Sequence, residues 1–514
     1  MSFENRLFYL LLLVSILLFA LAGRTPWLDE SMLLVNLRDI GWTDVGRPLP
    51  YYDQVAPPGQ LALGLLIRDL FGFEAVYPGL KLVSLGAYLG LVLILAQSFR
   101  PEGRPEFPLV VLALILMAPL LMNQVTQAKH YMFDAFVSAA ILASGYRLTQ
   151  GPTVGRLSAF VAICLAGTLF SFVSIISAMG TLAAVFIYLA LERERAGRKG
   201  ALVRVALTGL GLAGYFLIYK RLLVDPTAIY QLTAYPEVYQ KHLFAGGDLA
   251  VTGSEFLRLV LFSVSNRVLD TLASNGAPVF AFFLFNFAIL LFLFMGFRRG
   301  GTLRFVALAC GMTLLGTMVL NALGALPIPY ERHFSFLQPF TLTLIALLVL
   351  RFLSRWPRFP RWAVVLLLVF GLDGILNGMF RPRGEDMVAM AYLTSDENEE
   401  GVLPVWISFA SQPTFDFANW QGAPVHGVVG RESDYTSWTV RGGARDEEGE
   451  IRDDYPMRFV EDMRPYDRAR MILSHHWGTK PLVFLETAFK HGWDCEEETE
   501  VGAIMIYLCE REGD

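Results

Sequence analysis

The sequence is poor in charged residues and has no long basic tract. Only 17% of its 514 residues are charged and 54% are hydrophobic. Many apolar runs extend over about 15 to 20 residues, which is typical of a polytopic membrane protein and not of one large soluble core. Because the chain also lacks a nucleic-acid-binding motif, we do not expect nucleic acid as a partner.

Cysteine is scarce, with four residues in the whole chain. Cys164 and Cys310 lie inside apolar runs and are interpreted as small core or lipid-facing residues. Cys495 and Cys509 lie near the C-terminus, where they could pair if that region is outside the cytoplasm. Their spacing alone does not decide whether they pair.

Charge is distributed unevenly along the chain. Residues 381–514 carry 27 acidic and 13 basic residues, a balance of −14, while the whole chain has a net charge of −5. Residues 1–380 therefore carry +9. This contrast predicts two domains in two environments, a transmembrane domain over 1–380 and an acidic α/β domain over 381–514.

Apolar runs predict eleven membrane spans. They cover approximately residues 7–23, 82–99, 106–122, 131–147, 157–171, 173–190, 203–219, 277–297, 303–321, 335–351 and 362–379. The short loops rich in Lys and Arg indicate that the N-terminus is inside, which places the C-terminal domain outside. The first run also resembles a signal peptide with a cleavage site at Ala20-Leu21-Ala22, but in this polytopic context we expect it to be retained.

The regions between and after the spans contain shorter patterns. SMLLVNLRDI, QLALGLLIRDLFG and a segment within 220–276 have helical apolar spacing and predict amphipathic helices at the membrane interface. In the C-terminal region, LPVWISFA, KPLVFLE and GAIMIYLCE predict strands, and DYPMRFVEDMRPYDRARMIL predicts a helix. That region has no phosphate-binding glycine motif and no metal-ligand cluster, and its His475-His476 pair is interpreted as structural.

Three clusters of polar residues lie at the outer ends of spans. The first contains Asp29, Glu30 and Asp53, followed by Pro57-Pro58. The second contains Lys129, His130 and Tyr131, with Asp134 one turn further on; the third contains Tyr330, Glu331, Arg332 and His333. The acidic pair of the first cluster could be solvated loop charges next to a helix end, and the second and third clusters could be sets of interface anchors. Together on one membrane face, however, they match the needs of an enzyme that acts on an anionic lipid-linked substrate.

The order of these clusters resembles the GT-C superfamily of polyprenyl-phosphate-dependent glycosyltransferases. The closest branch is that of the protein O-mannosyltransferases and the lipid A aminoarabinose transferase. An acidic pair after the first span, a Pro-Pro segment, a basic-x-Tyr element and a late element ending in Pro (ERHFSFLQPF) carry the resemblance over roughly residues 1–380. Two positions depart from it: Ala56 precedes the prolines where many relatives have His or Arg, and Lys129-His130 stands where many have Arg.

The resemblance implies transfer of a sugar from a polyprenyl-phosphate donor to a lipid, polysaccharide or protein acceptor, with inversion at the anomeric carbon. Asp29 is then the base, with Glu30 as its supporting neighbour. Lys129 and Arg332 are the leading phosphate-binding candidates, and His130, Tyr131, Tyr330, His333 and Asp53 are further substrate-binding candidates. No cofactor is certain, although Asp29 with Asp53 could hold a divalent metal.

Two other functions remain open on the sequence. A transporter or flippase of a lipid-linked sugar would place polar residues near mid-membrane in repeated halves, a pattern that this chain lacks. A non-catalytic subunit of cell-envelope assembly is the other alternative. For all three functions we expect an integral protein of the inner (plasma) membrane, with its active face and C-terminal domain extracytoplasmic.

Overall fold

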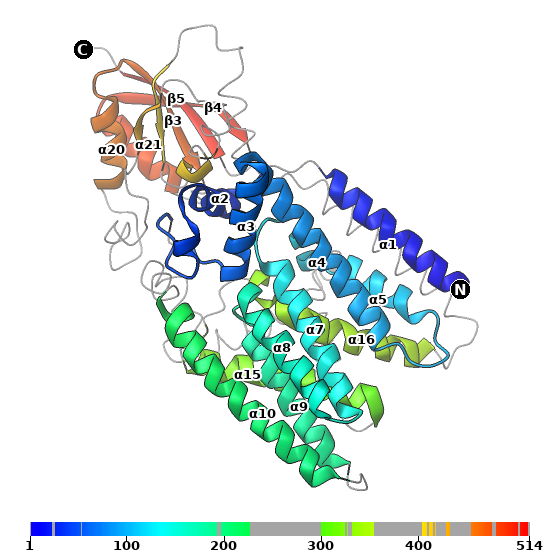
Figure 1. Ribbon diagram of the computed structural model, residues 1–514. Helices are drawn as coiled ribbons and strands as arrows, with labels where there is room; N and C mark the ends of the chain where they lie inside the picture. The colour runs from blue at the N-terminus through cyan, green and yellow to red at the C-terminus, as the bar shows by residue number, and fades with distance from the viewer. Residues whose placement is uncertain are drawn as a thin grey trace.

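The computed structural model describes a helical membrane part and a small C-terminal sheet (Figure 1). The described residues of the first part are 2–22, 26–52, 54–192, 197–226, 294, 300–323, 326 and 331–353. Those of the second part are 403–408, 411–414, 417, 428–431, 454–474, 480–501 and 504–511. The predicted boundary at residue 380 lies outside these ranges, so the division into two domains stays a prediction.

Nine of the eleven predicted spans coincide with helices. These are α1 (Phe3–Leu21), α4 (Val76–Ser98), α5 (Phe107–Leu116), α7 (Tyr131–Thr149), α8 (Val154–Phe170), α9 (Ser174–Leu191), α10 (Arg198–Tyr219, continued by a π-helical turn over Lys220–Val224), α15 (Gly301–Ala322) and α16 (Gln338–Leu353). The spans predicted at 277–297 and 362–379, and the interfacial helix expected within 220–276, lie outside the described residues. In the described part of the chain, α1, α4, α9, α10, α15 and α16 are long and apolar enough to cross a membrane.

The span predicted at 106–122 is broken in the structure. Helix α5 ends at Leu116, and a separate short helix, α6 (Pro119–Gln124), follows it. Pro119 explains the break, because proline has no N–H to continue the hydrogen-bond ladder and its ring collides with the preceding turn. The chain between α6 and α7 therefore runs as a non-helical connection at the end of the bundle.

Small residues allow the central helices to approach closely. A Cβ atom added at Gly180 on α9 would lie 2.7 Å from the Cα atom of Thr313 on α15. Similarly, a Cβ atom at Gly145 on α7 would lie 2.2 Å from the side chain of Thr181 on α9. Close backbone approach at small residues is the usual way in which membrane helices associate.

Helix α1 packs on the rest of the bundle along one face only. Phe8, Leu12 and Phe19 are buried, while Leu10, Leu13 and Leu17 on the other face are exposed. The hydroxyl of Ser15 is hydrogen-bonded to the hydroxyl of Tyr88 on α4, at 3.1 Å. This one-sided packing is expected of an outer helix of a membrane bundle.

Two further helices lie between α1 and α4 in the sequence. Helix α2 (Leu28–Asp39) and helix α3 (Pro58–Phe71) confirm the helical patterns of SMLLVNLRDI and QLALGLLIRDLFG, and the 3-10 turns η1 (Trp42–Asp44) and η2 (Phe73–Ala75) follow them in turn. Helix α3 starts at Pro58, the favoured place for proline in a helix, and exposes Leu66, Leu70 and Phe71.

The amphipathic pattern predicted for α2 is wrong. All residues from Glu30 to Leu37 are buried, so the helix is enclosed by protein and has no polar face toward water. The packing partners come from distant parts of the sequence, including Leu61 and Leu65 on α3 and Phe417 of the C-terminal part. Tertiary contacts therefore decide the burial of α2, and the sequence pattern does not reveal them.

The C-terminal part contains a five-stranded sheet with the order β2-β1-β3-β5-β4. Its strands are β1 (Val405–Ile407), β2 (Val428–Arg431), β3 (Arg468–Ser474), β4 (Trp493–Val501) and β5 (Ile504–Arg511). Strand β1 pairs in parallel with β2 and β3, whereas β5 pairs antiparallel with both β3 and β4. Helices α20 (Asp454–Met463) and α21 (Lys480–Lys490) pack beside the sheet, as Figure 1 shows.

Strands β1 and β5 confirm two predicted strands of the C-terminal part, and two other predictions there are wrong. KPLVFLE belongs to helix α21, in which Phe484 and Ala488 are buried one turn apart, so its apolar run has helical periodicity. The predicted long helix stops at Met463, and Arg468–Ser474 forms strand β3 instead. Pro465 lies between the two elements and explains the stop.

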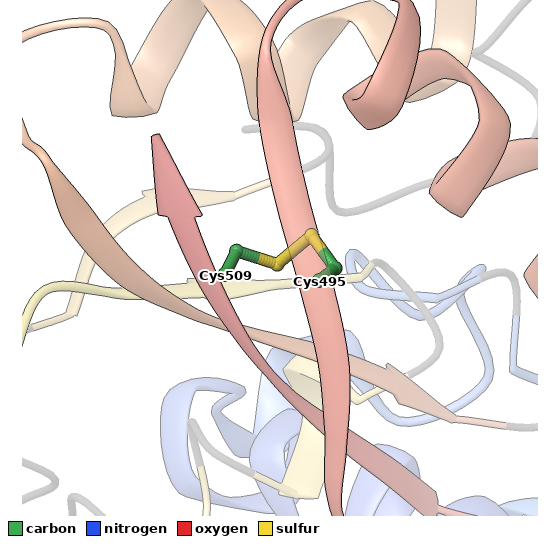
Figure 2. The surroundings of a disulfide bond; sticks show 2 residues. All are labelled: Cys495 and Cys509. Carbon is green, nitrogen blue, oxygen red and sulfur yellow. A yellow bond between two sulfur atoms is a disulfide. The ribbon is translucent and has the colours of Figure 1, made fainter. Parts of the chain in front are cut away.

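Cys495 and Cys509 form a disulfide in the structure. The two residues lie directly opposite each other on the neighbouring strands β4 and β5, as Figure 2 shows. Among the described residues, Phe417 of the C-terminal part contacts the membrane part: it is 2% exposed, and its ring lies 6.4 Å from the ring of Phe73.

Candidate active site

The candidate site begins at the N-terminus of α2. Asp29 and Glu30 lie in the first turn of this helix, where the helix dipole favours negative charge. Asp29 is half-buried, whereas Glu30 is 2% exposed. The Glu30 Oε2 atom accepts a hydrogen bond from the backbone N–H of Trp27 at 3.1 Å, so Glu30 caps its own helix.

The second oxygen of Glu30 reaches the connection between α6 and α7. The Glu30 Oε1 atom accepts a hydrogen bond from the backbone N–H of Ala128 at 2.6 Å. Residues 125–129 of this connection are all buried, and Lys129 follows Ala128 directly. The structure therefore brings the first cluster and the second cluster together, although about a hundred residues separate them in the sequence.

Lys129 is 3% exposed, and its ammonium group points to the first loop. The Nζ atom donates a hydrogen bond to Gln54 Oε1 at 2.6 Å. Gln54 follows Asp53, which lies outside the described residues, and Tyr52, which is fully buried with φ of 62°. A bulky residue in the left-handed region is uncommon, and such backbone strain is found preferentially at functional sites.

His130 and Tyr131 lie at the start of α7. The Nε2 atom of His130 lies 4.0 Å from Oδ2 of Asp134, one helical turn further on. The His130 ring also lies 4.7 Å from the ring of Tyr131 and 6.5 Å from that of Phe172. His130 therefore has a carboxylate on one side and aromatic rings on others.

Asp134 belongs to the second predicted cluster but was given no role there, although the spacing of four residues from His130 placed both on one helix face. It is 3% exposed, and among the residues that the structure describes its Oδ1 atom has no hydrogen-bond partner. The 3-10 helix η5 (Glu331–Leu337), which carries the buried Ser335, packs against α7. A buried carboxyl group in a membrane-spanning helix is a candidate functional group by default.

Of the third cluster, the structure describes the backbone of Glu331, Arg332 and His333. The backbone of Arg332 and His333 lies in η5 and is therefore carried to the start of α7, but their side chains are outside the description. Tyr330 and Asp53 lie outside the described residues. The structure thus joins the clusters around Glu30 and Lys129 through side chains, and places the third beside them through its backbone.

A divalent metal site was hypothesised at Asp29 and Asp53. Among the residues that the structure describes, no group of three or more His, Cys, Asp or Glu side chains could hold a metal ion. Asp53, the partner of Asp29 in the hypothetical metal site, is not among them. The divalent metal therefore remains an untested expectation.

Comparison with known proteins supports the fold. No protein-family model matches the chain, and no curated protein matches it in sequence. Among solved structures, the chain is similar to ArnT from Cupriavidus metallidurans in the apo state, with 13% identity, a TM-score of 0.55, and 98% of this chain and 97% of that chain covered. The same protein bound to undecaprenyl phosphate matches with 13% identity, a TM-score of 0.53 and the same coverage of both chains.

An archaeal protein shares the fold as well. The Archaeoglobus fulgidus oligosaccharyltransferase in complex with Zn and sulfate matches with 14% identity and a TM-score of 0.52 over 96% of this chain and 72% of that chain. Both neighbours are GT-C proteins, so the GT-C-like fold is confirmed. The chain is therefore an integral membrane protein of this fold class with a C-terminal sheet.

Proposed function

We propose that this protein is a glycosyltransferase that moves a sugar from a polyprenyl-phosphate donor to an extracytoplasmic acceptor. The observation that carries the proposal is the contact between the two main clusters. Through the hydrogen bond of Glu30 to Ala128, a carboxylate-bearing helix end is joined to the residue that precedes a buried lysine. A base for the acceptor and a cation for the donor phosphate are the two groups that this transfer needs.

The reaction requires little help from a general acid. A hydroxyl oxygen of the acceptor attacks the anomeric carbon of the sugar and the bond from that carbon to the phosphate oxygen breaks. The electron pair leaves with the polyprenyl phosphate, which is a stable anion, and the hydroxyl proton passes to Asp29. The direct displacement inverts the anomeric carbon. Glycoside hydrolysis, with its poorer leaving group, needs a second carboxyl group as an acid.

We assign the remaining groups to the donor. Lys129 and Arg332 bind the phosphate, and His130, Tyr131, Tyr330, His333 and Asp53 line the substrate site. The ammonium group of lysine is a point charge, whereas the guanidinium group of arginine can bind two phosphate oxygens at once. Lys129 therefore binds the phosphate through its single ammonium nitrogen. The fold likeness to a protein whose structure contains undecaprenyl phosphate supports a lipid phosphate as the ligand.

We also propose that the active face and the sheet lie outside the cytoplasm, on an inner (plasma) membrane. Two features support this orientation. Lys and Arg concentrate in the loops assigned to the inner side. In addition, the Cys495–Cys509 disulfide is of the kind that persists in oxidising compartments.

The test uses purified full-length protein with undecaprenyl-phosphate sugars and a membrane extract as the source of acceptor. We expect release of undecaprenyl phosphate by the parent and loss of release in Asp29→Asn, with donor binding retained. Asp39→Asn, at the other end of α2 and paired with Arg38 at 2.7 Å, is the matched control and is expected to stay active.

Two outcomes would contradict the proposal. Donor binding without release from any extract would favour a transporter or a non-catalytic subunit. Release that Asp29→Asn leaves unchanged would keep the transferase but remove Asp29 from its site.

A further inference from the structure

The backbone of Ala128 is held by two buried side chains from two different helices. Its N–H donates to Glu30 Oε1 of α2 at 2.6 Å, and its carbonyl oxygen accepts from Gln60 Nε2 of α3 at 2.5 Å. Glu30 and Gln60 are each 2% exposed, and Ala128 is 1% exposed. A buried non-helical connection must find such partners for its backbone, because bulk water does not reach buried peptide groups.

A third helix contributes one more bond to this segment. The hydroxyl of Ser84 on α4 donates to the carbonyl oxygen of Gln127 at 2.7 Å, and Ser84 is 1% exposed. Three side chains from three helices thus hold two successive peptide groups directly before Lys129. We call Glu30, Gln60 and Ser84 the Ala128 clamp.

The ammonium end of Lys129 is held as well. Gln54, its acceptor, lies in a loop that Asn36 of α2 fixes through two hydrogen bonds with the backbone of Tyr51, of 2.9 and 3.0 Å. Helix α2 therefore holds the backbone before Lys129 through Glu30, and it holds the loop at the tip of the lysine side chain through Asn36. The same helix carries Asp29.

The roles of the clamp residues are geometric. Both oxygens of Glu30 accept backbone hydrogen bonds and the side chain is enclosed, so it is not presented to a substrate. Gln60 and Ser84 contact backbone oxygens and have no charge to offer to a phosphate. A misplacement of a binding group by about 1 Å can cost about a hundredfold in rate, which makes such supports important.

We infer that Glu30, Gln60 and Ser84 are positioning residues that set the place of the Lys129 ammonium group relative to Asp29. The consequence for donor binding rests on the proposed function, whereas the clamp itself does not. Glu30 thereby supports Asp29 by holding α2 to the lysine-bearing segment, and not by exchanging a proton.

The main test compares two Ser→Ala variants that each lose one buried hydrogen bond of 2.7 Å. Ser84→Ala opens the clamp, and Ser138→Ala removes the bond between Ser138 on α7 and Ser177 on α9. The first readout is the rate at which an amine-reactive acetylating reagent modifies Lys129 in the full-length protein in nanodiscs, followed by mass spectrometry. We expect about a fivefold faster modification in Ser84→Ala, the scale of one neutral hydrogen bond, and no change in Ser138→Ala.

The second readout is the affinity for undecaprenyl phosphate. We expect weaker binding in Ser84→Ala and a larger loss in Gln60→Leu, both compared at equal amounts of folded protein. Equal Lys129 modification in Ser84→Ala and Ser138→Ala would overturn the clamp. If the parent itself does not bind undecaprenyl phosphate, the proposed function fails, and the Lys129 modification rates still decide on the clamp.

Glu30→Gln separates positioning from proton transfer. Glutamine keeps one acceptor oxygen but loses the charge, so a positioning role predicts reduced turnover with the same pH profile as the parent. A displaced pH profile in a folded Glu30→Gln protein would show that Glu30 is itself a titrating base and would overturn this assignment.

Discussion

The contact between α9 and α15 predicts opposite effects of two glycine-to-alanine substitutions. In Gly180→Ala, the new Cβ would lie 2.4 Å from Thr313 Oγ1, 2.7 Å from its Cα and 2.8 Å from its backbone nitrogen. Because two of these atoms are backbone, the helices must move apart. Overpacking of this kind costs about 1 to 3 kcal/mol, and the better helix propensity of alanine returns about 0.8 to 1 kcal/mol.

Gly311→Ala is the matched control on the facing helix. Among the residues that the structure describes, a Cβ at Gly311 would meet nothing within 4 Å, so only the gain in propensity remains. The assay is the midpoint of thermal unfolding in one detergent, followed by the loss of the monodisperse protein peak. We expect the midpoint of Gly180→Ala to fall below that of Gly311→Ala by at least about 2 °C. Equal midpoints, or a higher one for Gly180→Ala, would refute the packing of α9 against α15.

Three further predictions follow from the site and from the C-terminal part. Lys129→Ala should weaken binding of undecaprenyl phosphate at least about tenfold, since a charged hydrogen bond is lost, and equal affinity in a binding titration would contradict its role. Replacing both Cys495 and Cys509 with serine opens a loop with a sequence separation of 14, which should cost the sheet about 3 kcal/mol and speed its proteolysis; reduced parent protein should behave alike. Phe417→Ala leaves a cavity in the cluster that Phe417 forms with α2 and α3, and it should lower the stability of this packing by about 3 to 5 kcal/mol. The expected sign is faster amide hydrogen exchange in α2 and α3, and unchanged exchange would show that the ring does not stabilise these helices.

Local patterns were enough to predict much of the helical part. Apolar runs located nine described spans, and the pattern of QLALGLLIRDLFG located α3, which starts at Pro58. These features depend on residues close in sequence, either through hydrophobicity over one helix length or through the fixed backbone angle of proline. The order of short motifs then indicated the GT-C-like fold.

Features that depend on distant contacts could not be predicted. Strand β4 reads WDCEEETEV, and its acidic residues conceal a strand whose pairing with β5 becomes visible only in three dimensions. The run KPLVFLE is too short for its period to separate a strand from a helix. In α2, burial on all sides comes from partners as far away as Phe417, so the predicted polar face is wrong.

The candidate site shows the same limit at the level of single residues. Asp29, Glu30 and Lys129 were selected by type and position, but the sequence held no sign that Glu30 bonds to Ala128 or that Gln54 meets Lys129. The contact of His130 with Asp134 was readable in principle, because residues four apart on a helix are neighbours.

The bond between Glu30 and Ala128 also has a consequence for the order in which the protein is made. Its two partners are 98 positions apart, so the acceptor is synthesised and delivered to the membrane long before its donor. Until α5 and α6 have been inserted and the chain has turned back, the Glu30 carboxylate must remain hydrated, because an ionised group is costly to enclose without its partners. The first loop thus reaches its final shape only after the segment before α7 has arrived, and assembly of the site is coupled to insertion of the third and fourth predicted spans.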